Sequence, residues 1–471
     1  MNVNAEKLAQ DLKAIVGEDH VHTGLFERVS YADTALPYDV EEGDLPDVVV
    51  QPADAHEISE VLKYANQQKI PVATYGSGTS LMFGTKPKHH GISMSTERLT
   101  SLQINEEHQW LECGGGLKTG QLIKELGKLG YFLPIQTQIG SSMGGALGIN
   151  TLGHLTDNMF GGRPISHVLG LEVVLPTGEI IETGSKCLRR PAGWDLSRIF
   201  IGSEGTLGII TKVRMVLVPM QETVDAVGFF KRVEDIGHAV GRMYREKFPL
   251  PMDGEFVGEK ACKVGCEALG LDFPEGALAI TRSMGRTKED ASKNAQEMVR
   301  LFNEAGATEA FILDDPEMAE KVWGVREYAM HWGQEKGLKG FLAIEVNPTL
   351  PRLAEAMTEL THITEGRNDL IGETEAYLYG HVGSDSLHCV FVFPYDWPTE
   401  KMKQVVDEIW NLEKELQLKY DGVGGDWGWL PHRVPLFREK YGETAYDLIK
   451  KMKQLFDPNN ILNRGNIEGE V

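Results

Sequence analysis

Two histidines seven residues apart are the first candidates for chemistry. The segment from Tyr379 to His388 reads Tyr-Gly-His-Val-Gly-Ser-Asp-Ser-Leu-His, with the first of the two imidazoles at His381. On an unbroken strand these side chains would face opposite ways, because successive side chains alternate. The Gly383–Ser386 segment can break the strand and let both imidazoles converge. With a nearby carboxylate they would suit zinc, manganese or iron. Histidines near a strand also occur simply as core or surface residues.

Glycine-rich segments form a second kind of candidate site. The loop from Gly76 to Ser80 follows a short β-type run and offers backbone N–H groups and hydroxyls that can surround an anion. The segments 141–150 and 203–210 are also rich in glycine, which lets the backbone approach a bulky ligand closely. Taken alone, such clusters indicate tight turns of a β-rich domain equally well.

The elements that position the first glycine loop form a βαβ unit. Strands are predicted at Val48–Val50 and Val72–Ala73, with an amphipathic helix over 55–67 between them and Asp54 as its N-cap. The second strand leads directly into the loop at Gly76. A further strand over 110–113 and the helix that follows it are predicted to belong to the same small α+β subdomain.

Downstream of Glu222 the pattern changes. Helical segments over 291–305 and 317–332 alternate with β-type runs at 341–346 and 389–393, and the last stretch, 401–471, is again helical. This alternation predicts a separate α+β domain that begins near Pro219.

Together these segments resemble a known flavoprotein family. The string Ser203-Glu204-Gly205-Thr206-Leu207-Gly208-Ile209-Ile210, the two other glycine-rich segments and the tail 456–463 resemble the FAD-binding domain of the vanillyl-alcohol oxidase and p-cresol methylhydroxylase superfamily. The branch is that of D-lactate dehydrogenase, D-2-hydroxyglutarate dehydrogenase and the glycolate oxidase flavin subunit. The resemblance implies an α+β fold with a two-subdomain PCMH-type FAD-binding domain at 1–220, a cap (substrate) domain at 221–410 and a C-terminal segment, 411–471, that packs back on the FAD domain.

The same resemblance implies which residues bind FAD. The family commonly has an arginine where Tyr75 stands, but a nest made of backbone groups does not need it. No histidine or cysteine lies between residues 76 and 81, so the FAD is expected to be non-covalent. The implied FAD-binding residues are Gly76, Ser77, Gly78, Thr79, Ser80, Pro134, Thr137, Ser141, Ser142, Gly144, Gly145, Gly148, Asn150, Glu204, Gly205 and Ile210.

The resemblance also implies catalytic roles, with one departure. His381 and His388 would bind a divalent metal that orients the hydroxyl and carboxylate of the substrate. Relatives supply a third ligand and a base from a Glu-His-Gly motif, where this chain has Asp426 and Trp427. Asp426 can still bind a metal, but an indole only donates and cannot take a proton, so His432 is the nearest candidate base. Trp427 and its neighbours would suit a bulky or aromatic substrate, or they simply pack a domain interface.

A further candidate lies in the segment Val322-Trp323-Gly324-Val325-Arg326. It is similar to a Trp-x-x-Arg string whose arginine binds a substrate carboxylate in the family. A planar guanidinium can do this with two parallel hydrogen bonds. The alternative is that Arg326 is a surface residue on a helix.

Composition excludes several classes of function. The 471-residue chain has a formal charge of −22, which disfavours nucleic acid and anionic membrane surfaces as partners. Its five cysteines are too few and too scattered for a disulfide framework, so we expect a cytoplasmic protein with free, buried thiols. Residues 1–19 read as a polar amphipathic helix, and no apolar run has the length of a membrane span.

These observations predict an FAD-dependent dehydrogenase of 2-hydroxy acids. No Rossmann fingerprint occurs in the expected setting, so the acceptor would be an electron-transfer protein, a quinone-linked partner or dioxygen rather than NAD. A homodimer is compatible with the sequence. Two alternatives remain open: oxidation of a phenolic or benzylic alcohol, and a flavin-holding subunit of a larger complex.

Overall fold

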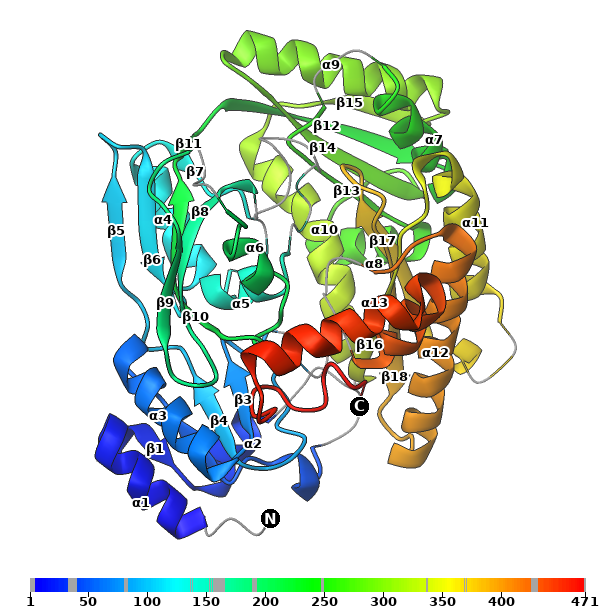
Figure 1. Ribbon diagram of the computed structural model, residues 1–471. Helices are drawn as coiled ribbons and strands as arrows, with labels where there is room; N and C mark the ends of the chain where they lie inside the picture. Colours follow the sequence, from blue (N-terminus) through cyan, green and yellow to red (C-terminus); the bar gives the residue numbers. More distant parts are fainter. Residues whose placement is uncertain are drawn as a thin grey trace.

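The computed structural model of the chain is shown in Figure 1. It describes residues 5–32, 40–79, 84–135, 137, 139–151, 153, 155, 166–188, 193–246, 250–335, 338–367, 369, 371–424 and 431–469, without the side chains of 329–339.

A four-stranded sheet carries the first glycine loop. Its strand order is β1 (Val21–His22), β2 (Val48–Val50), β4 (Ile92–Ser95) and β3 (Val72–Tyr75), with helices α1 (Ala5–Val16), α2 (Leu25–Ser30) and α3 (Ala55–Gln68). The predicted N-cap is confirmed, since the Asp54 carboxylate accepts hydrogen bonds from the backbone N–H groups of His56 and Glu57. The predicted βαβ unit is present with one strand more, because β4 lies between β2 and β3 and is parallel to both.

A separate five-stranded antiparallel sheet follows. Its order is β5 (Leu102–Asn105), β6 (Trp110–Gly114), β10 (Ile209–Val216), β8 (Val168–Val174) and β9 (Ile180–Gly184). Assigning the strand over 110–113 to the first subdomain was therefore wrong. Cys113 pairs with Val213, which lies about a hundred residues away in the sequence. The hydrophobic pattern of residues 110–113 gives no information about so distant a partner. Helices α4 (Thr119–Lys128), α5 (Met143–Gly148) and α6 (Ser197–Phe200) and the strand pair β7 (Tyr131–Phe132) and β11 (Val218–Pro219) complete this half.

The second half of the chain forms a seven-stranded antiparallel sheet. Its order is β15 (Glu309–Leu313), β12 (Glu222–Phe230), β14 (Ala277–Gly285), β13 (Asp253–Val257), β17 (Glu375–His381), β18 (Leu387–Pro394) and β16 (Leu338–Val346). One apolar core joins this sheet to α7 (Val233–Met243), α9 (Lys288–Glu304), α11 (Leu353–Glu365) and α12 (Thr399–Tyr420). A second core joins the other face to α8 (Glu259–Leu269) and α10 (Pro316–Glu335).

The C-terminal segment returns to the first half, as expected. Helix α13 (Val434–Phe456) runs back from α12 toward the first two sheets (Figure 1). The backbone of Val72 in β3 then bonds to both Ile461 and Asn463, and the buried Lys453 side chain donates to the carbonyl oxygens of Thr206 and Leu462. The tail thus ties the two N-terminal sheets together.

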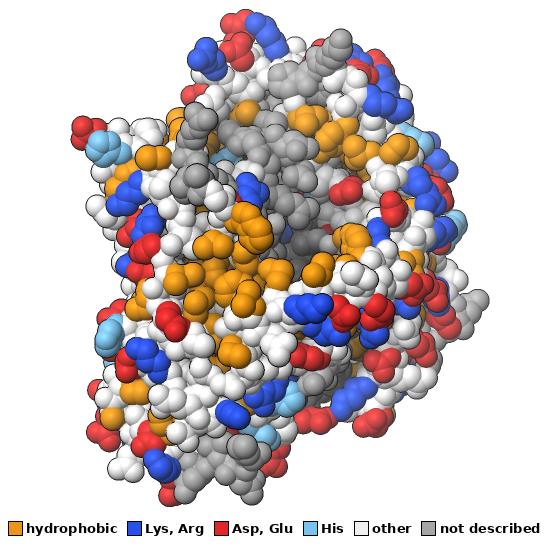
Figure 2. Space-filling model, viewed as in Figure 1, with side chains coloured by type: hydrophobic (Ala, Val, Ile, Leu, Met, Phe, Trp, Pro, Cys, Tyr) orange, Lys and Arg blue, Asp and Glu red, His pale blue; other side chains and the backbone are white. Residues whose placement is uncertain are grey.

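The surface of this face is uneven in character. In Figure 2 hydrophobic side chains gather near the centre beside a hollow, and charged side chains of both signs cover the periphery. None of the described helices is long and apolar enough to cross a membrane. No cysteine forms a disulfide, and Cys187 is exposed whereas the other four are buried as expected.

Candidate functional site

A polar band crosses the face of the seven-stranded sheet that packs on α8 and α10. On this face, each of the strands named below carries an apolar side chain that belongs to the core. Two residues away along the same strand, each carries a polar side chain. Residues two apart on a strand share a face, so the polar positions of neighbouring strands line up. The apolar and polar members are Val227 and Asp225, Ile280 and Arg282, Val257 and Glu255, Tyr379 and His381, Val390 and His388, and Ala343 and Glu345.

The β17–β18 hairpin brings the two predicted histidines together. β17 ends at His381, β18 begins at Leu387, and the His381 N–H donates to the Ser386 carbonyl oxygen at 3.0 Å. The Nε2 atoms of His381 and His388 lie 3.2 Å apart, and both side chains are buried. The turn between the strands therefore makes the imidazoles converge, as the sequence led us to expect.

Glu255 fixes the orientation of His381. Its Oε1 lies 3.1 Å from Nδ1 of His381, its opposite residue in the β13–β17 register. A carboxylate only accepts, so the neutral imidazole carries its proton on Nδ1 and keeps a lone pair on Nε2. A histidine with its Nδ1–H on a carboxylate is the usual arrangement of an imidazole that binds a metal through Nε2.

His388 is held by a serine and a second buried glutamate. Its Nε2 lies 3.1 Å from the Ser386 hydroxyl, which donates to Glu345 Oε1 at 2.9 Å. Asn347 donates to the same Glu345 oxygen at 2.9 Å. Glu255 therefore lies behind His381, on the nitrogen that faces away from His388, whereas Ser386 contacts the Nε2 of His388 that faces His381.

The predicted base, His432, lies farther along the same polar network. Its Nε2 is 2.8 Å from Glu413 Oε2. Its ring stacks on Trp410, with the ring centres 4.6 Å apart and an angle of 8° between the ring planes. Arg433 lies 2.6 Å from Glu413 and 3.5 Å from Glu345, and so connects the two groups. Burial alone would raise the pKa of Glu413, but Arg433 and His432 outweigh it and lower that pKa to about 2. Burial lowers the pKa of His432 despite the opposing effect of Glu413.

Arg326 lies on α10 over the polar band. Its NH1 is 3.4 Å from Glu255 Oε1, and its guanidinium carbon lies 5.4 Å from the centre of the Tyr379 ring. Burial opposes the charged form, but Glu255 raises the pKa of Arg326. The side chain is 23% exposed, so it is not the surface residue of the alternative reading. Glu255 thus touches both Arg326 and His381.

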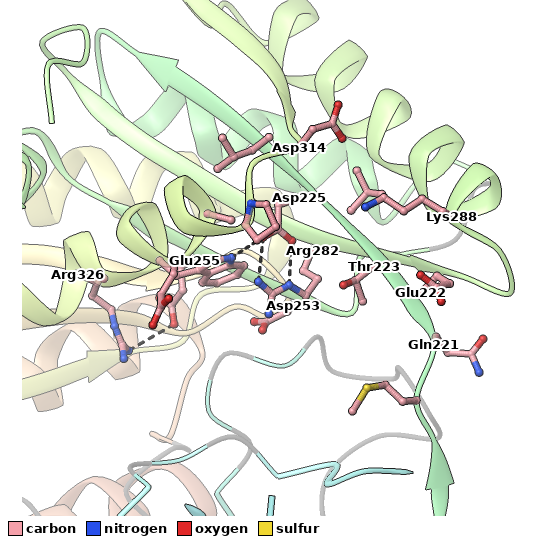
Figure 3. Close-up of a pocket in the computed structure, with 18 of the residues that line it drawn as sticks. Gln221, Glu222, Thr223, Asp225, Asp253, Glu255, Arg282, Lys288, Asp314 and Arg326 are labelled. Atoms are coloured by element: carbon pink, nitrogen blue, oxygen red, sulfur yellow. Dashed lines mark hydrogen bonds and ion pairs between the residues drawn. The ribbon is translucent and has the colours of Figure 1, made fainter. Parts of the chain in front are cut away.

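A cavity of about 900 Å³ opens beside this arginine. Glu255 and Arg326 form one end of its lining, and Arg282 and Asp225 lie farther along (Figure 3). Exposed residues such as Glu222 complete the wall. The cavity therefore extends from the polar band toward solvent.

In the first half, hydroxyl groups join the predicted flavin-binding segments. Thr79 Oγ1 lies 3.0 Å from Ser141 Oγ, which is 3.3 Å from Thr137 Oγ1, and the Ser142 N–H donates to Ser77 Oγ at 3.0 Å. These side chains are uncharged donors and acceptors, which suits a pyrophosphate. A Cβ on Gly76 would lie 2.5 Å from Ser142 Oγ, so a larger residue would displace the hydroxyl that caps α5.

The other predicted flavin residues lie where the two sheets meet. Asn150, Glu204 and Gly205 have φ of 52°, 52° and 68°, and the Glu204 N–H donates to the Gly148 carbonyl oxygen at 3.0 Å. Gly144 packs its backbone against Gly115, Gly145 donates to Ser142, and Pro134 and Ile210 are buried.

Two buried polar atoms at this junction fit a bound cofactor. Asn150 Oδ1 and Thr74 Oγ1 have no hydrogen-bond partner among the described residues. Buried polar atoms are normally paired, so a ligand with polar groups fits here. The cofactor role of each of these residues stays a prediction.

Part of the predicted site lies outside the described residues, namely Ser80, Asp426 and Trp427. Within the described parts of the chain, no group of three or more His, Cys, Asp or Glu side chains could hold a metal ion. The two imidazoles would therefore need a ligand from elsewhere, such as Asp426.

Sequence reasoning missed the residues that orient the predicted ones. Glu255, Glu345, Glu413 and Arg433 lie in segments without a recognisable motif. One signal could have found Glu345, because it is a single acidic residue in the apolar β-type run Ala-Ile-Glu-Val. An isolated charge in a buried strand needs a partner.

Comparisons with known proteins agree on the family. Residues 220–467 match the family model described as "FAD linked oxidases, C-terminal domain", and residues 46–184 match "FAD binding domain". The glycolate oxidase subunit GlcD of Bacillus subtilis (strain 168) is 26% identical, covering 97% of this chain and 95% of its own. A D-lactate dehydrogenase of Archaeoglobus fulgidus is 28% identical, covering 89% of this chain and 91% of its own.

Solved structures share the fold. A p-cresol methylhydroxylase with bound substrate superposes with a TM-score of 0.77 at 18% identity, covering 98% of this chain and 96% of its own. A 4-ethylphenol oxidase from Gulosibacter chungangensis superposes with a TM-score of 0.78 at 16% identity, and the match covers 99% of this chain and 98% of that chain. The chain therefore belongs to the family of FAD-linked oxidases, with an α+β fold of the p-cresol methylhydroxylase type.

Proposed function

We propose that this protein oxidises a 2-hydroxy acid to the 2-oxo acid with non-covalent FAD and an acceptor other than NAD. The relatives with printed activities include a glycolate oxidase subunit, D-lactate dehydrogenases and a D-2-hydroxyglutarate dehydrogenase, which supports this substrate class. The glycolate oxidase relative is named as a subunit, which also supports an electron acceptor within a complex. The domain boundaries proposed are 1–220, 221–410 and 411–471.

The observation that carries the proposal is the polar band. It holds two converging imidazoles, and one of them, His381, shares the Glu255 carboxylate with the guanidinium of Arg326. A 2-hydroxy acid offers a carboxylate and a neighbouring hydroxyl, which are the groups that an arginine and a pair of imidazoles can bind at once. A benzylic alcohol carries no carboxylate that the arginine could bind.

Arg326 would bind the substrate carboxylate. Its one polar contact among the described residues is the 3.4 Å approach to Glu255, so most of its five N–H donors remain for a ligand. The Glu255 carboxylate would keep the guanidinium in place without saturating it.

His381, His388 and Asp426 would hold a divalent metal, either zinc, manganese or iron. His381 offers a lone pair on Nε2, and His388 Nε2, which donates to Ser386 in the structure, would bind the ion once the proton of that ring stood on Nδ1. Bound there, the ion would polarise the C2 hydroxyl, and bound FAD would accept the hydride from C2.

His432 would accept the hydroxyl proton. Glu413 fixes its Nε2–H, and Nδ1 has no hydrogen-bond partner within the described part of the chain. Burial keeps this imidazole neutral, so Nδ1 can act as a base.

Anaerobic reduction of the flavin tests the proposal. We expect 2-hydroxy acids to bleach the flavin absorbance and benzylic alcohols not to. Elemental analysis should find about one divalent ion per chain, and chelation should stop the bleaching while the flavin stays bound. Reduction by aromatic alcohols in chelated protein would instead favour the phenol-oxidising alternative, and reduction by neither class would favour a flavin-holding subunit.

A further inference from the structure

A second arginine in the cavity is held in a fixed position. Arg282 on β14 lies opposite Asp225 on β12, and its Nε and NH2 donate to the two carboxylate oxygens at 2.8 and 2.9 Å. The indole Nε1 of Trp323 donates to Asp225 at 2.9 Å, and the Arg282 guanidinium lies 5.0 Å from the centre of the same indole ring. Such a paired and stacked guanidinium has little freedom to move.

Arg282 still has donors to offer. A guanidinium carries five N–H groups, and Asp225 takes two of them. No other acceptor among the described residues bonds to Arg282, whose side chain is 31% exposed and lines the cavity. The remaining N–H groups are available to a ligand that carries oxygen acceptors.

The charge of the cavity limits what that ligand can be. Seven carboxylates line the cavity, against Arg282, Lys288 and Arg326 as the cations. Glu255 and Asp253 lie between the two arginines in Figure 3. A substrate carboxylate on Arg326 adds one more negative charge, so a second anionic group would be repelled. Hydroxyl groups add no charge, and each can donate to a carboxylate and accept from a guanidinium.

The size of the cavity also favours an extended ligand with several hydroxyl groups. A volume of about 900 Å³ is near the upper end of small-molecule sites, and a three-carbon acid would leave most of it empty. Trp323 and Arg326 lie about one helical turn apart on α10. An extended substrate held at Arg326 by its carboxylate can therefore reach Arg282 with its other end.

We propose that the substrate is a polyhydroxylated 2-hydroxy acid with a single carboxylate, that is, a sugar acid. Arg326 binds the C1 carboxylate, and Arg282, positioned by Asp225 and Trp323, binds the distal hydroxyl groups. This inference rests on the proposed oxidation of 2-hydroxy acids and names the substrate class. Oxidation at C2 removes a hydride from carbon and a proton from the hydroxyl, so the product is the 2-oxo sugar acid and the flavin takes up the two electrons.

The first test compares substrates in anaerobic flavin reduction by the holoenzyme. We expect D-gluconate or D-galactonate to give kcat/KM at least about 10-fold above that of D-lactate. D-2-hydroxyglutarate, with its second carboxylate, should be the poorest. A preference for D-lactate or D-2-hydroxyglutarate would overturn the sugar-acid inference and leave the proposed oxidation standing. Reduction by none of these acids would overturn both.

The second test changes the distal residues. The double variant Asp225→Asn/Arg282→Gln removes the pair together, so that no buried carboxylate is left unpaired. We expect its KM for the preferred sugar acid to rise at least about 10-fold, with kcat and the KM for D-lactate unchanged. The matched control is Glu246→Gln/Arg300→Gln, an ion pair between the turn that follows α7 and helix α9, outside the cavity lining. It should change neither KM.

A binding measurement separates recognition from turnover. D-Mannonate, the C2 epimer of D-gluconate, presents the same distal hydroxyls with the opposite configuration at the reacting carbon. It should raise the melting temperature of the parent protein and of the control, but not that of the Asp225→Asn/Arg282→Gln variant. Equal shifts in all three proteins, or a D-lactate KM that rises by the same factor as the sugar-acid KM, would contradict a role of Arg282 in binding the distal hydroxyls.

Discussion

Arg326 shares the Glu255 carboxylate with His381, and this sharing limits how tightly the guanidinium is held. The 3.4 Å approach is longer than a good charge-assisted hydrogen bond, whereas His381 lies at 3.1 Å from the same oxygen. A substrate carboxylate can therefore take the donors of Arg326 without breaking the support of His381.

The first prediction follows from this geometry. Arg326→Lys keeps the charge but removes the planar fork, so KM for a 2-hydroxy acid should rise about 10-fold to 100-fold. Arg245→Lys, at an exposed arginine in the turn that follows α7, is the control and should behave like the parent. Steady-state kinetics on both variants decide the matter, and an unchanged KM in Arg326→Lys would rule out carboxylate binding there.

A second residue-scale prediction concerns pH. Burial lowers the pKa of His432 below its ordinary 6.5, so the imidazole is neutral at pH 7 and becomes charged only as the pH falls through the lowered value. A base must be unprotonated, so the acid limb of the kcat/KM profile should lie below pH 6.5. His432→Gln should abolish this limb and lower the rate about 100-fold. His56→Gln, on the exposed face of α3, should leave the profile intact. An acid limb that persists in His432→Gln would assign the base to another group.

At the scale of elements, the β17–β18 hairpin shows what a local pattern can and cannot predict. The turn residues between His381 and His388 predicted that the strand would break and the imidazoles converge, because glycine and serine favour turns. The partner of His381 could not be predicted in this way. Glu255 comes from a strand far away in the sequence, and the register that places it there is set by the packing of the whole sheet.

The hairpin also offers a test of how closely the imidazoles must be positioned. A Cβ on Gly380 would lie 2.4 Å from the Ser386 carbonyl oxygen and 2.6 Å from a ring carbon of Phe256. Gly380→Ala should therefore shift the hairpin, cost about 1–3 kcal/mol of stability and abolish turnover, with FAD retained in the other half of the chain. Gly127→Ala in α4 has nothing within 4 Å of the added methyl group and should be neutral or slightly stabilising. Thermal unfolding and flavin reduction measure both effects, and a fully active Gly380→Ala variant would show that the hairpin tolerates displacement.

At the scale of the whole molecule, the sheets differ in how far the sequence predicts them. The βαβ unit of the first sheet follows from local signals, such as the Asp54 cap and the apolar stripe of α3. The five-stranded sheet does not, because β6 pairs with β10 across about a hundred residues. The ion pair of Asp225 and Arg282 is hidden for the same reason, since it exists only in the register of β12 and β14. Long-range registers of this kind decide which polar residues line the cavity.

The C-terminal tail shows how such a long-range contact supports the cofactor site. Asn463 accepts from the Thr74 N–H at 2.8 Å, donates from its backbone to Val72 at 2.9 Å, and donates from its side chain to the Glu204 carbonyl oxygen at 2.6 Å. Asn463 therefore joins the strand that leads into the Gly76 loop to the turn at Glu204. These two segments of the predicted flavin site adjoin different sheets.

We predict that Asn463→Ala weakens FAD binding by up to about 30-fold, because it removes two side-chain hydrogen bonds of about 1 kcal/mol each that hold the segments in position. The effect should show as flavin released at lower temperature and at lower urea concentration, while the half of the chain that forms the seven-stranded sheet unfolds as in the parent. Asn303→Ala, which removes an exposed asparagine on α9, is the control and should not change flavin release. If the tail served only the stability of the first half, FAD and fold would be lost at the same urea concentration in Asn463→Ala. Flavin loss that precedes unfolding is the outcome expected of a tail that completes the cofactor site.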